Sequence, residues 1–251
     1  MSPNNNNNNN TTTTVLTGRK EFVPRATPLL STSFVTDPTI TYILSSFSPS
    51  ERDAYRPTYF KVLLTAAVLN GATISCITND GNGESGNESG EWESCGVLMP
   101  QGAYVGNWWT AWQAGWLRVL WRLGWGGFQR MAVDLGDLTE SCKHKALAHD
   151  KKYYYIFLLG THPTSRGKGH CTRLIKHYQA LATKEGVPIW LEAATEYCWK
   201  LYERLGFVTV EELRLAEGKA DGMGRQCVGG EGVRLWAMIW RPEGVGESDR
   251  R

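Results

Sequence analysis

Apolar residues in the second half of the chain follow two periodicities, one typical of strands and one typical of helices. Residues 153–160 are almost continuously apolar, which predicts a strand that is covered on both faces. Residues 172–185 carry apolar side chains at helical spacing, and residues 188–193 form a second apolar run. Since strand, helix and strand in this order form a βαβ unit, we expect the two strands to be parallel.

The remaining periodic segments extend this pattern into a mixed α/β fold. After the βαβ unit, the sequence predicts a helix at 197–205 and strands at 207–215 and 233–241. The segment between these last two strands, 216–232, contains six glycines, so we expect an antiparallel hairpin. In the first half, the sequence predicts helices at 39–47 and 51–70 and strands at 72–77 and 95–99.

Low-complexity segments set the expected limits of the folded part. Seven consecutive asparagines and four threonines occupy 4–14, and such a polar tract has nothing to bury. Residues 79–94 carry five acidic residues, four glycines and no basic residue. We therefore expect disordered tails at 1–20 and 242–251, a mobile loop at 79–94, and a single domain over 21–241.

Six of the eleven tryptophans lie in one segment, residues 107–128. Trp112, Trp116, Val119 and Leu123 have the spacing of one helix face. Two arginines and four internal glycines interrupt the segment, which argues against a transmembrane helix. We expect a bulky helical insert that packs over a pocket, and association with a membrane surface is the less favoured alternative.

Composition excludes several classes of protein. The 27 basic and 25 acidic side chains give a net charge of +2, so the chain is not a polycation built to bind nucleic-acid backbones. An apolar share of 41% excludes full disorder. The six cysteines include no Cys-x-x-Cys pair, which argues against a structural zinc site and favours reduced thiols. A polar N-terminus without an apolar core favours a cytoplasmic location and leaves a nuclear one open.

Positive charge is concentrated in residues 151–184, which contain seven Lys or Arg residues and no Asp or Glu. Residues 165–171, at the centre, form a basic glycine-rich turn between a predicted strand and a predicted helix. Unpaired N–H groups and the helix dipole favour an anion there, so the turn is either a phosphate site or an ordinary βα loop. A P-loop is excluded because Gly169 follows Lys168, and the dinucleotide fingerprint G-x-G-x-x-G is not formed.

Two short motifs stand out in this part of the chain. Residues 166–171 read Arg-Gly-Lys-Gly-His-Cys, and residues 201–207 read Leu-Tyr-Glu-Arg-Leu-Gly-Phe. Both resemble motifs of the GCN5-related N-acetyltransferase (GNAT) superfamily: the first is similar to its acyl-CoA motif Q/R-x-x-G-x-G/A, with Cys171 at the sixth position, and the second is similar to F/L-Y-E-x-x-G-F. The resemblance is strong over 150–215 and weaker to 241. Residues 34–38 with Tyr42, and residues 191–194, resemble a subgroup that includes puromycin N-acetyltransferase and many fungal relatives.

This resemblance implies the acyl-CoA N-acyltransferase fold, a mixed and mostly antiparallel sheet flanked by helices with a central parallel strand pair. It also implies acetyl-CoA as co-substrate, an amine-bearing small molecule as acceptor, and direct transfer in a ternary complex without a metal. We expect no nucleic-acid partner and either a monomer or a homodimer. The candidate cofactor-binding residues are Leu159, Gly160, Thr161, Arg166, Gly167, Lys168, Gly169, His170, Cys171 and Thr172.

Tyr202 and Glu192 are the candidate catalytic residues. An amine must be neutral to attack a thioester, and the departing thiolate benefits from a proton donor. Tyr202 resembles the tyrosine that serves as this donor in the family, whereas an isolated tyrosine there would be a core aromatic. Glu192 is the candidate base, and its alternatives are a satisfied carboxylate or a contact for the substrate amine. A backbone N–H within 159–161 is expected to stabilise the oxyanion.

The alternative hypothesis is a non-catalytic acyl-CoA-binding or membrane-surface module whose acceptor site has decayed. The departures at Cys171 and at Cys198, where the subgroup often has Asn, leave room for it. Direct transfer needs no covalent intermediate, so we interpret both cysteines as structural. The sequence offers no motif that identifies the acceptor.

Overall fold

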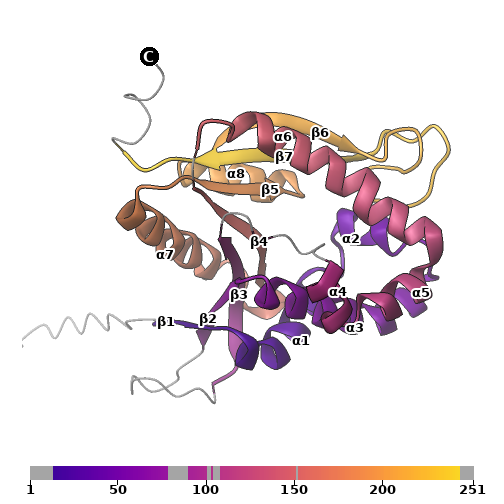
Figure 1. Ribbon diagram of the computed structural model, residues 1–251, viewed down its shortest axis with the longest axis horizontal. Helices are drawn as coiled ribbons and strands as arrows, with labels where there is room; N and C mark the ends of the chain where they lie inside the picture. The colour runs from indigo at the N-terminus through magenta and orange to yellow at the C-terminus, as the bar shows by residue number, and fades with distance from the viewer. Residues whose placement is uncertain (1–13, 79–89, 101–102, 104–107, 151, 244–251) are drawn as a thin grey trace, which may run out of the picture.

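One mixed sheet organises the residues that the computed structural model describes, namely 14–78, 90–100, 103, 108–150 and 152–243. Within these residues, seven strands are ordered β1-β2-β3-β4-β5-β7-β6 across the sheet (Figure 1). The strands are β1 (Val15–Gly18), β2 (Thr73–Thr78), β3 (Trp92–Pro100), β4 (Tyr154–Thr161), β5 (Ile189–Ala193), β6 (Val208–Leu215) and β7 (Val233–Trp240).

The central pair, β4 and β5, is parallel, and every other neighbouring pair is antiparallel. This arrangement confirms the predicted parallel strands and the predicted β6–β7 hairpin, and with them the predicted fold class. The parallel register covers only Tyr154 opposite Ile189 and Tyr155 opposite Trp190. The two strands therefore part toward their carboxyl ends, and this parting is where the candidate site lies.

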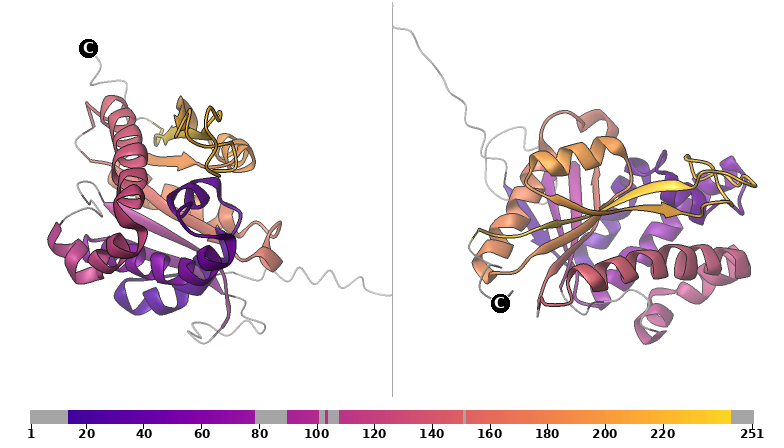
Figure 2. Two further views of the ribbon diagram at one scale, coloured as in Figure 1. Left: turned by 90° about the vertical axis from the view of Figure 1, so that its right-hand side faces the viewer. Right: turned by 90° about the horizontal axis from the view of Figure 1, so that it is seen from above.

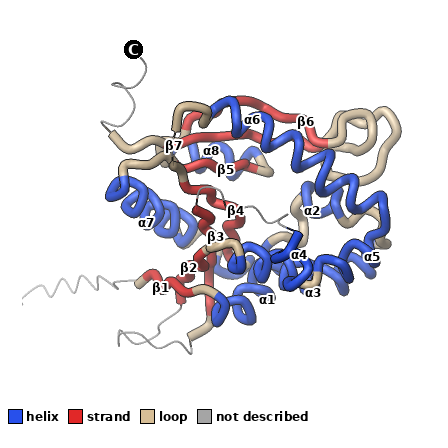
Figure 3. Tube along the Cα trace, viewed as in Figure 1, coloured by secondary structure: helices blue, strands red, loops and turns tan. Residues whose placement is uncertain are grey.

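Helices cover both faces of the sheet (Figure 3). On one face, α7 packs against β2, β3 and β4, and α8 packs against β5. On the other, α1 packs on β3 and β4 and against α3, while α6 packs on β6 and β7 (Figure 2). The helical elements are η1 (Lys20–Phe22), α1 (Val23–Ser33), α2 (Pro38–Ile43), α3 (Pro49–Leu69), α4 (Trp108–Ala114), α5 (Trp116–Phe128), η2 (Gln129–Asp137), α6 (Leu138–Ala146), η3 (Pro163–Ser165), α7 (His170–Glu185) and α8 (Glu196–Arg204).

A bulge in β4 decides which side chains face which layer. The register between β3 and β4 shifts so that Phe157 has no opposing residue, whereas Ile156 and Leu158 do. As a result, Phe157 and Leu158 both pack on the α1–α3 side, while Leu159 packs on the α7 side. Bulges of this kind commonly redirect side chains beside a site.

Two of the segments expected to be disordered include residues that form strands. The predicted tail 1–20 includes Val15–Gly18, but these residues pair with β2 as β1. The predicted mobile loop 79–94 includes residues 92–94, which belong to β3. Residues 1–13, 79–89 and 244–251 lie outside the described residues, so the rest of these predictions concerns residues that the structure does not describe.

The tryptophan-rich segment is not one helix. Gly115 has φ +91°, a left-handed conformation that ends α4 and starts α5, and Gly124 breaks the helical geometry again. Trp116, Val119 and Leu123 pack inward as predicted, but Trp112 is exposed because it lies before the break. Most of the expected cover over a pocket therefore comes from α5, with Ala111 of α4 beside it. The segment's other tryptophans are also exposed: Trp108, Trp109, Trp121 and Trp125.

No helix among the described residues is both long and apolar enough to cross a membrane. The described residues also contain no cluster of three or more His, Cys, Asp or Glu side chains arranged to hold a metal ion.

Candidate active site at the parting of two parallel strands

The glycine-rich turn leads from η3 into α7 and has the backbone that the phosphate-site hypothesis requires. Gly167 and Gly169 both have φ +80°, a conformation that other residues adopt only with strain. A Cβ atom placed at either glycine would meet nothing within 4 Å. The turn therefore leaves open space in front of the first turn of α7, where N–H groups have no acceptor within the helix.

The side chains of the turn are already engaged within the protein. Arg166 donates from Nη2 to the carbonyl oxygen of Ser33, at the end of α1, at 3.0 Å. Lys168 donates from Nζ to Glu93 Oε1 at 2.9 Å, and His170 Nε2 lies 2.9 Å from Glu93 Oε2. The backbone of the turn, more than its side chains, is thus free to receive a ligand.

Glu93 is an anchor for this turn that the sequence did not reveal. It comes from β3, and its Oε1 also accepts a hydrogen bond from the buried Ser165 hydroxyl at 3.0 Å. Burial alone would raise the pKa of Glu93, but the hydrogen bonds from Lys168 and Ser165 outweigh it and hold the pKa below its usual range. Burial lowers the pKa of His170, and the negative charge of Glu93 offsets only part of this lowering.

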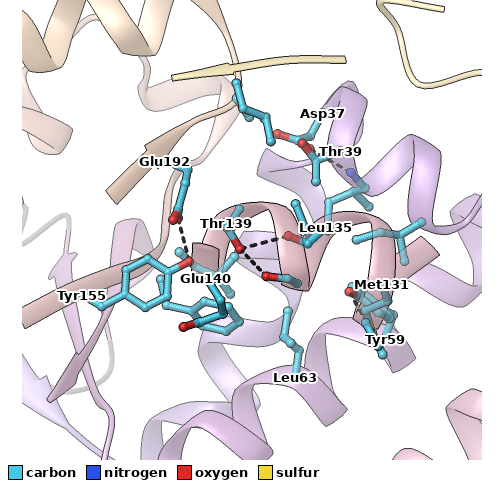
Figure 4. Close-up of a pocket in the computed structure, with 18 of the residues that line it drawn as sticks. Asp37, Thr39, Tyr59, Leu63, Met131, Leu135, Thr139, Glu140, Tyr155 and Glu192 are labelled. Atoms are coloured by element: carbon cyan, nitrogen blue, oxygen red, sulfur yellow. Dashed lines mark hydrogen bonds between the residues drawn. The ribbon is translucent and has the colours of Figure 1, made fainter. Parts of the chain in front are cut away.

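Glu192 lies on β5 two residues beyond the last residue that pairs with β4, and it is paired with Ala237 of β7 on the other side. Its side chain faces the α6 side of the sheet, as does that of Trp190. Its two carboxylate oxygens are held from two directions. Trp190 Nε1 donates to Oε1 at 2.6 Å. The Tyr155 hydroxyl donates to Oε2 at 2.7 Å (Figure 4). Burial raises the pKa of Glu192, although both hydrogen bonds favour the anion. A carboxylate that is fixed in orientation and made more basic has the properties of a general base.

Tyr202 lies on α8 and faces the opposite side of the sheet. Its ring packs in one cluster with Leu159 of β4, Cys171 of α7 and Cys198 of α8, and its hydroxyl is hydrogen-bonded to the Cys198 thiol. Burial raises the pKa of Tyr202 well above its usual range, so the hydroxyl stays protonated near neutral pH. The cluster brings the strand end, the start of α7 and the candidate proton donor together.

A cavity of about 470 Å³ lies beside Glu192, on the face of the sheet away from α7 (Figure 4). It is lined by residues of the helical elements α2, α3, α4, α5, η2 and α6 and by residues of the strands β3, β4, β5 and β7. No residue of the glycine turn contributes to its lining. Its volume is within the range typical of small-molecule sites.

Asp37 lies at the edge of this cavity and begins α2, where it accepts a hydrogen bond from the backbone N–H of Ile40 at 2.9 Å. Burial raises the pKa of Asp37 to about 6, against the backbone hydrogen bonds that favour its anion. The charge of Asp37 also raises the pKa values of the cavity residue Tyr59 and of Cys198. Asp37 thus connects the cavity electrostatically with the Tyr202 cluster.

Comparison with known proteins identifies this arrangement. The model of the acetyltransferase (GNAT) family matches residues 115–207, a range that contains both sequence motifs. An uncharacterized N-acetyltransferase of Schizosaccharomyces pombe is 21% identical over 192 residues, 76% of this chain and 72% of the relative. A Corynebacterium glutamicum structure described as "histone acetyltransferase HPA2 and related acetyltransferase" shares the fold with a TM-score of 0.60, at 19% identity, over 92% of this chain and 96% of its own. These matches support membership of the chain in the GNAT superfamily, and the family model itself covers residues 115–207.

A second solved structure has a fold similar to that of this chain. Arylalkylamine N-acetyltransferase 2 of Aedes aegypti has a TM-score of 0.58 at 15% identity, and the match covers 90% of this chain and 98% of that one. At such identities the likeness shows the fold, and the roles of individual residues rest on the geometry described above.

The GNAT fold distributes the candidate residues around the parting of β4 and β5. Leu159, Gly160 and Thr161 form the end of β4, Thr172 lies in the first turn of α7, and Glu192 and Tyr202 flank the parting from opposite faces. No sequence pattern indicated a role for the residues that surround them, namely Glu93, Glu140, Lys143, Tyr155 and Trp190. Only the neighbourhood of Asp37 carried a signal, through the motif at 34–38.

Proposed function

We propose that this protein is an acetyl-CoA-dependent N-acetyltransferase that acylates the amine of a small molecule by direct transfer in a ternary complex. The observation that carries the proposal is the placement of Glu192 and Tyr202 on opposite faces of the sheet, at the parting of β4 and β5. The cavity lies on the Glu192 side, and the glycine turn lies on the Tyr202 side. An acceptor and an acyl donor can therefore approach one point without competing for space.

The residues of the turn fit an acyl-CoA. The open backbone at Gly167 and Gly169, followed by the N-terminus of α7, suits a pyrophosphate, because N–H groups and the helix dipole favour an anion. The end of β4, residues 159–161, lies beyond its pairing with β5 and can bind the pantetheine arm through backbone groups. Acetyl-CoA would supply the acetyl group as a thioester.

The chain's own residues would act on the acceptor and on the leaving group. Glu192 accepts a proton from the ammonium of the acceptor, so that the neutral nitrogen attacks the thioester carbonyl carbon. The N–C bond forms and the C–S bond breaks, while a backbone N–H of residues 159–161 stabilises the oxyanion. The Tyr202 hydroxyl donates a hydrogen bond, and then its proton, to the departing sulfur. The second proton of the attacking nitrogen leaves as the amide forms and restores the Tyr202 hydroxyl through solvent.

No cysteine is needed as a nucleophile in this scheme. Burial raises the pKa of the Cys171 thiol to about 12, so the thiolate is scarcely populated near neutral pH. Burial also raises the pKa of Cys198. Both side chains fit a role in packing around Tyr202.

Replacing Gly169 with Trp is expected to abolish the stabilisation of the protein by acetyl-CoA. The indole would occupy the open space in front of α7, where the phosphates are expected to bind. For the unaltered protein, a ligand at about 100 times its Kd stabilises the folded state by about 2.7 kcal/mol. The measurement is the shift in Tm with acetyl-CoA and with CoA.

Gly229→Trp is the matched control, because Gly229 also has a positive φ and open space but lies in the β6–β7 loop. This control should keep the ligand-induced shift despite a similar cost in backbone strain. Equal loss of the shift in both variants would contradict the placement of the cofactor. Release of free thiol with an amine panel then separates an enzyme from an acyl-CoA-binding module, since binding without release would favour the alternative hypothesis.

A further inference from the structure

The cavity beside Glu192 has a wall that is mainly apolar and rich in rings. A small molecule inside it would be surrounded by six aromatic side chains, from Phe34, Tyr59, Trp116, Phe128, Tyr155 and Phe157. Tyr59 and Trp116 contact each other edge to face, with ring centroids 6.1 Å apart, so their positions are fixed by packing. A site of this composition gains affinity by taking apolar and aromatic surface out of water.

Charge in the cavity is unbalanced toward the negative. Asp37, Glu140 and Glu192 contribute carboxyl groups, whereas Lys143 is the only basic side chain among the lining residues that the structure describes. Lys143 is itself engaged, because it forms an ion pair with Glu140 and its Nζ lies 4.8 Å from the centre of the Tyr155 ring. An ammonium group is attracted to such a site, and a carboxylate on the ligand is repelled.

Two polar atoms of the lining residues are buried and have no hydrogen-bond partner among the described residues, Thr39 Oγ1 and Trp116 Nε1. Buried polar groups are normally satisfied, so an unpaired one beside a cavity indicates a polar atom of a ligand. Thr39 lies next to Asp37 at the same end of the cavity (Figure 4). These atoms favour an acceptor with a hydrogen-bonding substituent on its apolar body.

We propose that the acceptor is a hydrophobic primary amine with an aromatic body and without a carboxylate near the amine. This inference rests on the proposed function and narrows its substrate class. The cavity offers too little polar surface for a linear polyamine, whose several ammonium groups would need separate partners. An amino acid fits the ring-lined wall but brings its carboxylate toward Glu192 and Asp37.

The test compares thiol release from acetyl-CoA with tryptamine, 2-phenylethylamine, phenylalanine and spermidine. We expect kcat/KM for 2-phenylethylamine to exceed that for phenylalanine by about 100-fold or more, because like charges in a buried site cost several kcal/mol. We expect spermidine to be a poor acceptor. Efficient turnover of spermidine or phenylalanine would overturn this inference and leave the proposed function intact.

Ala132→Phe, in the cavity wall, is expected to raise KM for tryptamine by about tenfold or more, because the added ring occupies acceptor volume. Its control is Val133→Phe, at an exposed neighbouring position outside the lining. The acetyl-CoA-induced shift in Tm should be unchanged in both variants. Unchanged kinetics in Ala132→Phe would overturn the assignment of the cavity, whereas loss of both acetyl-CoA binding and thiol release in the unaltered protein would refute the proposed function itself.

A second inference rests on a different observation, the exposed apolar side chains of α4 and α5. Trp121 and Trp125 are 84% and 79% exposed, and Leu117 and three tryptophans of α4 are exposed with them. Trp109 contacts both Trp108 and Trp112, with ring centroids 5.5 Å apart in each pair. Residues 94–133 contain Arg118, Arg122 and Arg130 and no acidic residue.

We infer that these exposed side chains of α4 and α5 bind the surface of an anionic phospholipid bilayer. Tryptophan prefers the interface between water and lipid, where its ring is apolar and its N–H remains hydrated. The exposed Arg118 and Arg122 lie beside Leu117 and Trp121 on α5 and are complementary to anionic headgroups. An amphipathic face of this kind binds in the plane of the membrane and does not cross it.

The test is co-sedimentation with phosphatidylcholine vesicles that contain or lack phosphatidylserine. We expect binding that weakens about tenfold without phosphatidylserine and about tenfold or more in Trp121→Ala/Trp125→Ala, because two apolar anchors are removed. Tyr197→Ala, at an exposed aromatic on α8, is the control and should bind normally. No sedimentation of the unaltered protein, or equal sedimentation of the double variant, would overturn the inference.

Discussion

Replacing Glu192 with Gln is expected to lower kcat/KM for acetyl transfer by about 10²- to 10⁴-fold near neutral pH, the usual contribution of a general base. The substitution removes the charge and keeps the shape. The amide oxygen can still accept from Trp190, and the amide N–H can donate to the Tyr155 hydroxyl once that hydroxyl reverses its role. The loss is therefore attributable to the base and not to a collapsed site.

The pH dependence provides the sharper measurement. Because burial raises the pKa of Glu192, activity of the unaltered protein should rise with pH as the carboxyl ionises, through a range above that of an ordinary glutamate. This acidic limb of the kcat/KM profile should be missing in Glu192→Gln. A variant that lost activity but retained the limb would assign the ionisation to another group, and Asp37, with a pKa of about 6, would be the first to examine.

In Glu192→Gln the free energy of unfolding near neutral pH is expected to stay the same or rise, although activity falls. A carboxyl whose pKa is raised by folding stabilises the protein below its unfolded pKa, and this contribution is lost as pH rises through the folded value. The unaltered protein therefore buries a charge at a cost near neutral pH, and Glu192→Gln should be at least as stable there. Urea unfolding of both proteins as a function of pH checks this expectation and serves as the folding control.

Local sequence patterns were sufficient for the central part of the fold. The apolar run that forms β4, the helical spacing of α7 and the run that forms β5 lie close together in the chain, so their connection dictated a parallel pair. The prediction for Tyr202 depends on a compact motif, and the prediction for Glu192 depends on its position near the end of an apolar run. In these cases the information lies within a few residues of the position predicted.

Elements that depend on distant packing were missed. The helix α1 contains Pro24 and Pro28, which discourage a helical prediction, yet Ala26, Leu29 and Leu30 are buried against the sheet and hold it in place. Glu93 lies in a stretch whose composition resembles a loop. Its partner Lys168 is 75 residues away, so no local pattern could indicate the contact.

The tryptophan-rich segment shows the limit of periodicity as a signal. Spacing alone placed Trp112 and Trp116 on one helix face, but Gly115 between them adopts a positive φ and rotates the two helices apart. Glycine is permitted in a helix at a modest cost, so its presence did not decide between continuity and a break. The backbone conformation decided it, and it left Trp112 in solvent.

Replacing Tyr202 with Phe is expected to lower kcat by about 10²-fold or more while leaving KM for acetyl-CoA nearly unchanged, because the hydroxyl assists the leaving group and not binding. The ring stays in its cluster, where it contacts Phe207 with centroids 5.9 Å apart. Only one hydrogen bond, to the Cys198 thiol, is lost, so the free energy of unfolding should fall by no more than about 1 kcal/mol. Tyr154→Phe, at a hydroxyl that binds the surface residue Glu185, is the matched control.

Varying the acidity of the leaving thiol tests whether Tyr202 acts as a proton donor or only as a packing residue. The pKa of Tyr202 is raised well above its usual range, so a free phenolate would be unfavourable and proton transfer must accompany cleavage of the C–S bond. An acetyl thioester of a more acidic thiol needs less assistance and should restore much of the lost rate in Tyr202→Phe. The unaltered protein should gain far less from the same thioester, since its donor already provides that assistance. If both proteins accelerated equally, Tyr202 would act through packing alone, and the donor would have to be sought among groups at the end of β4.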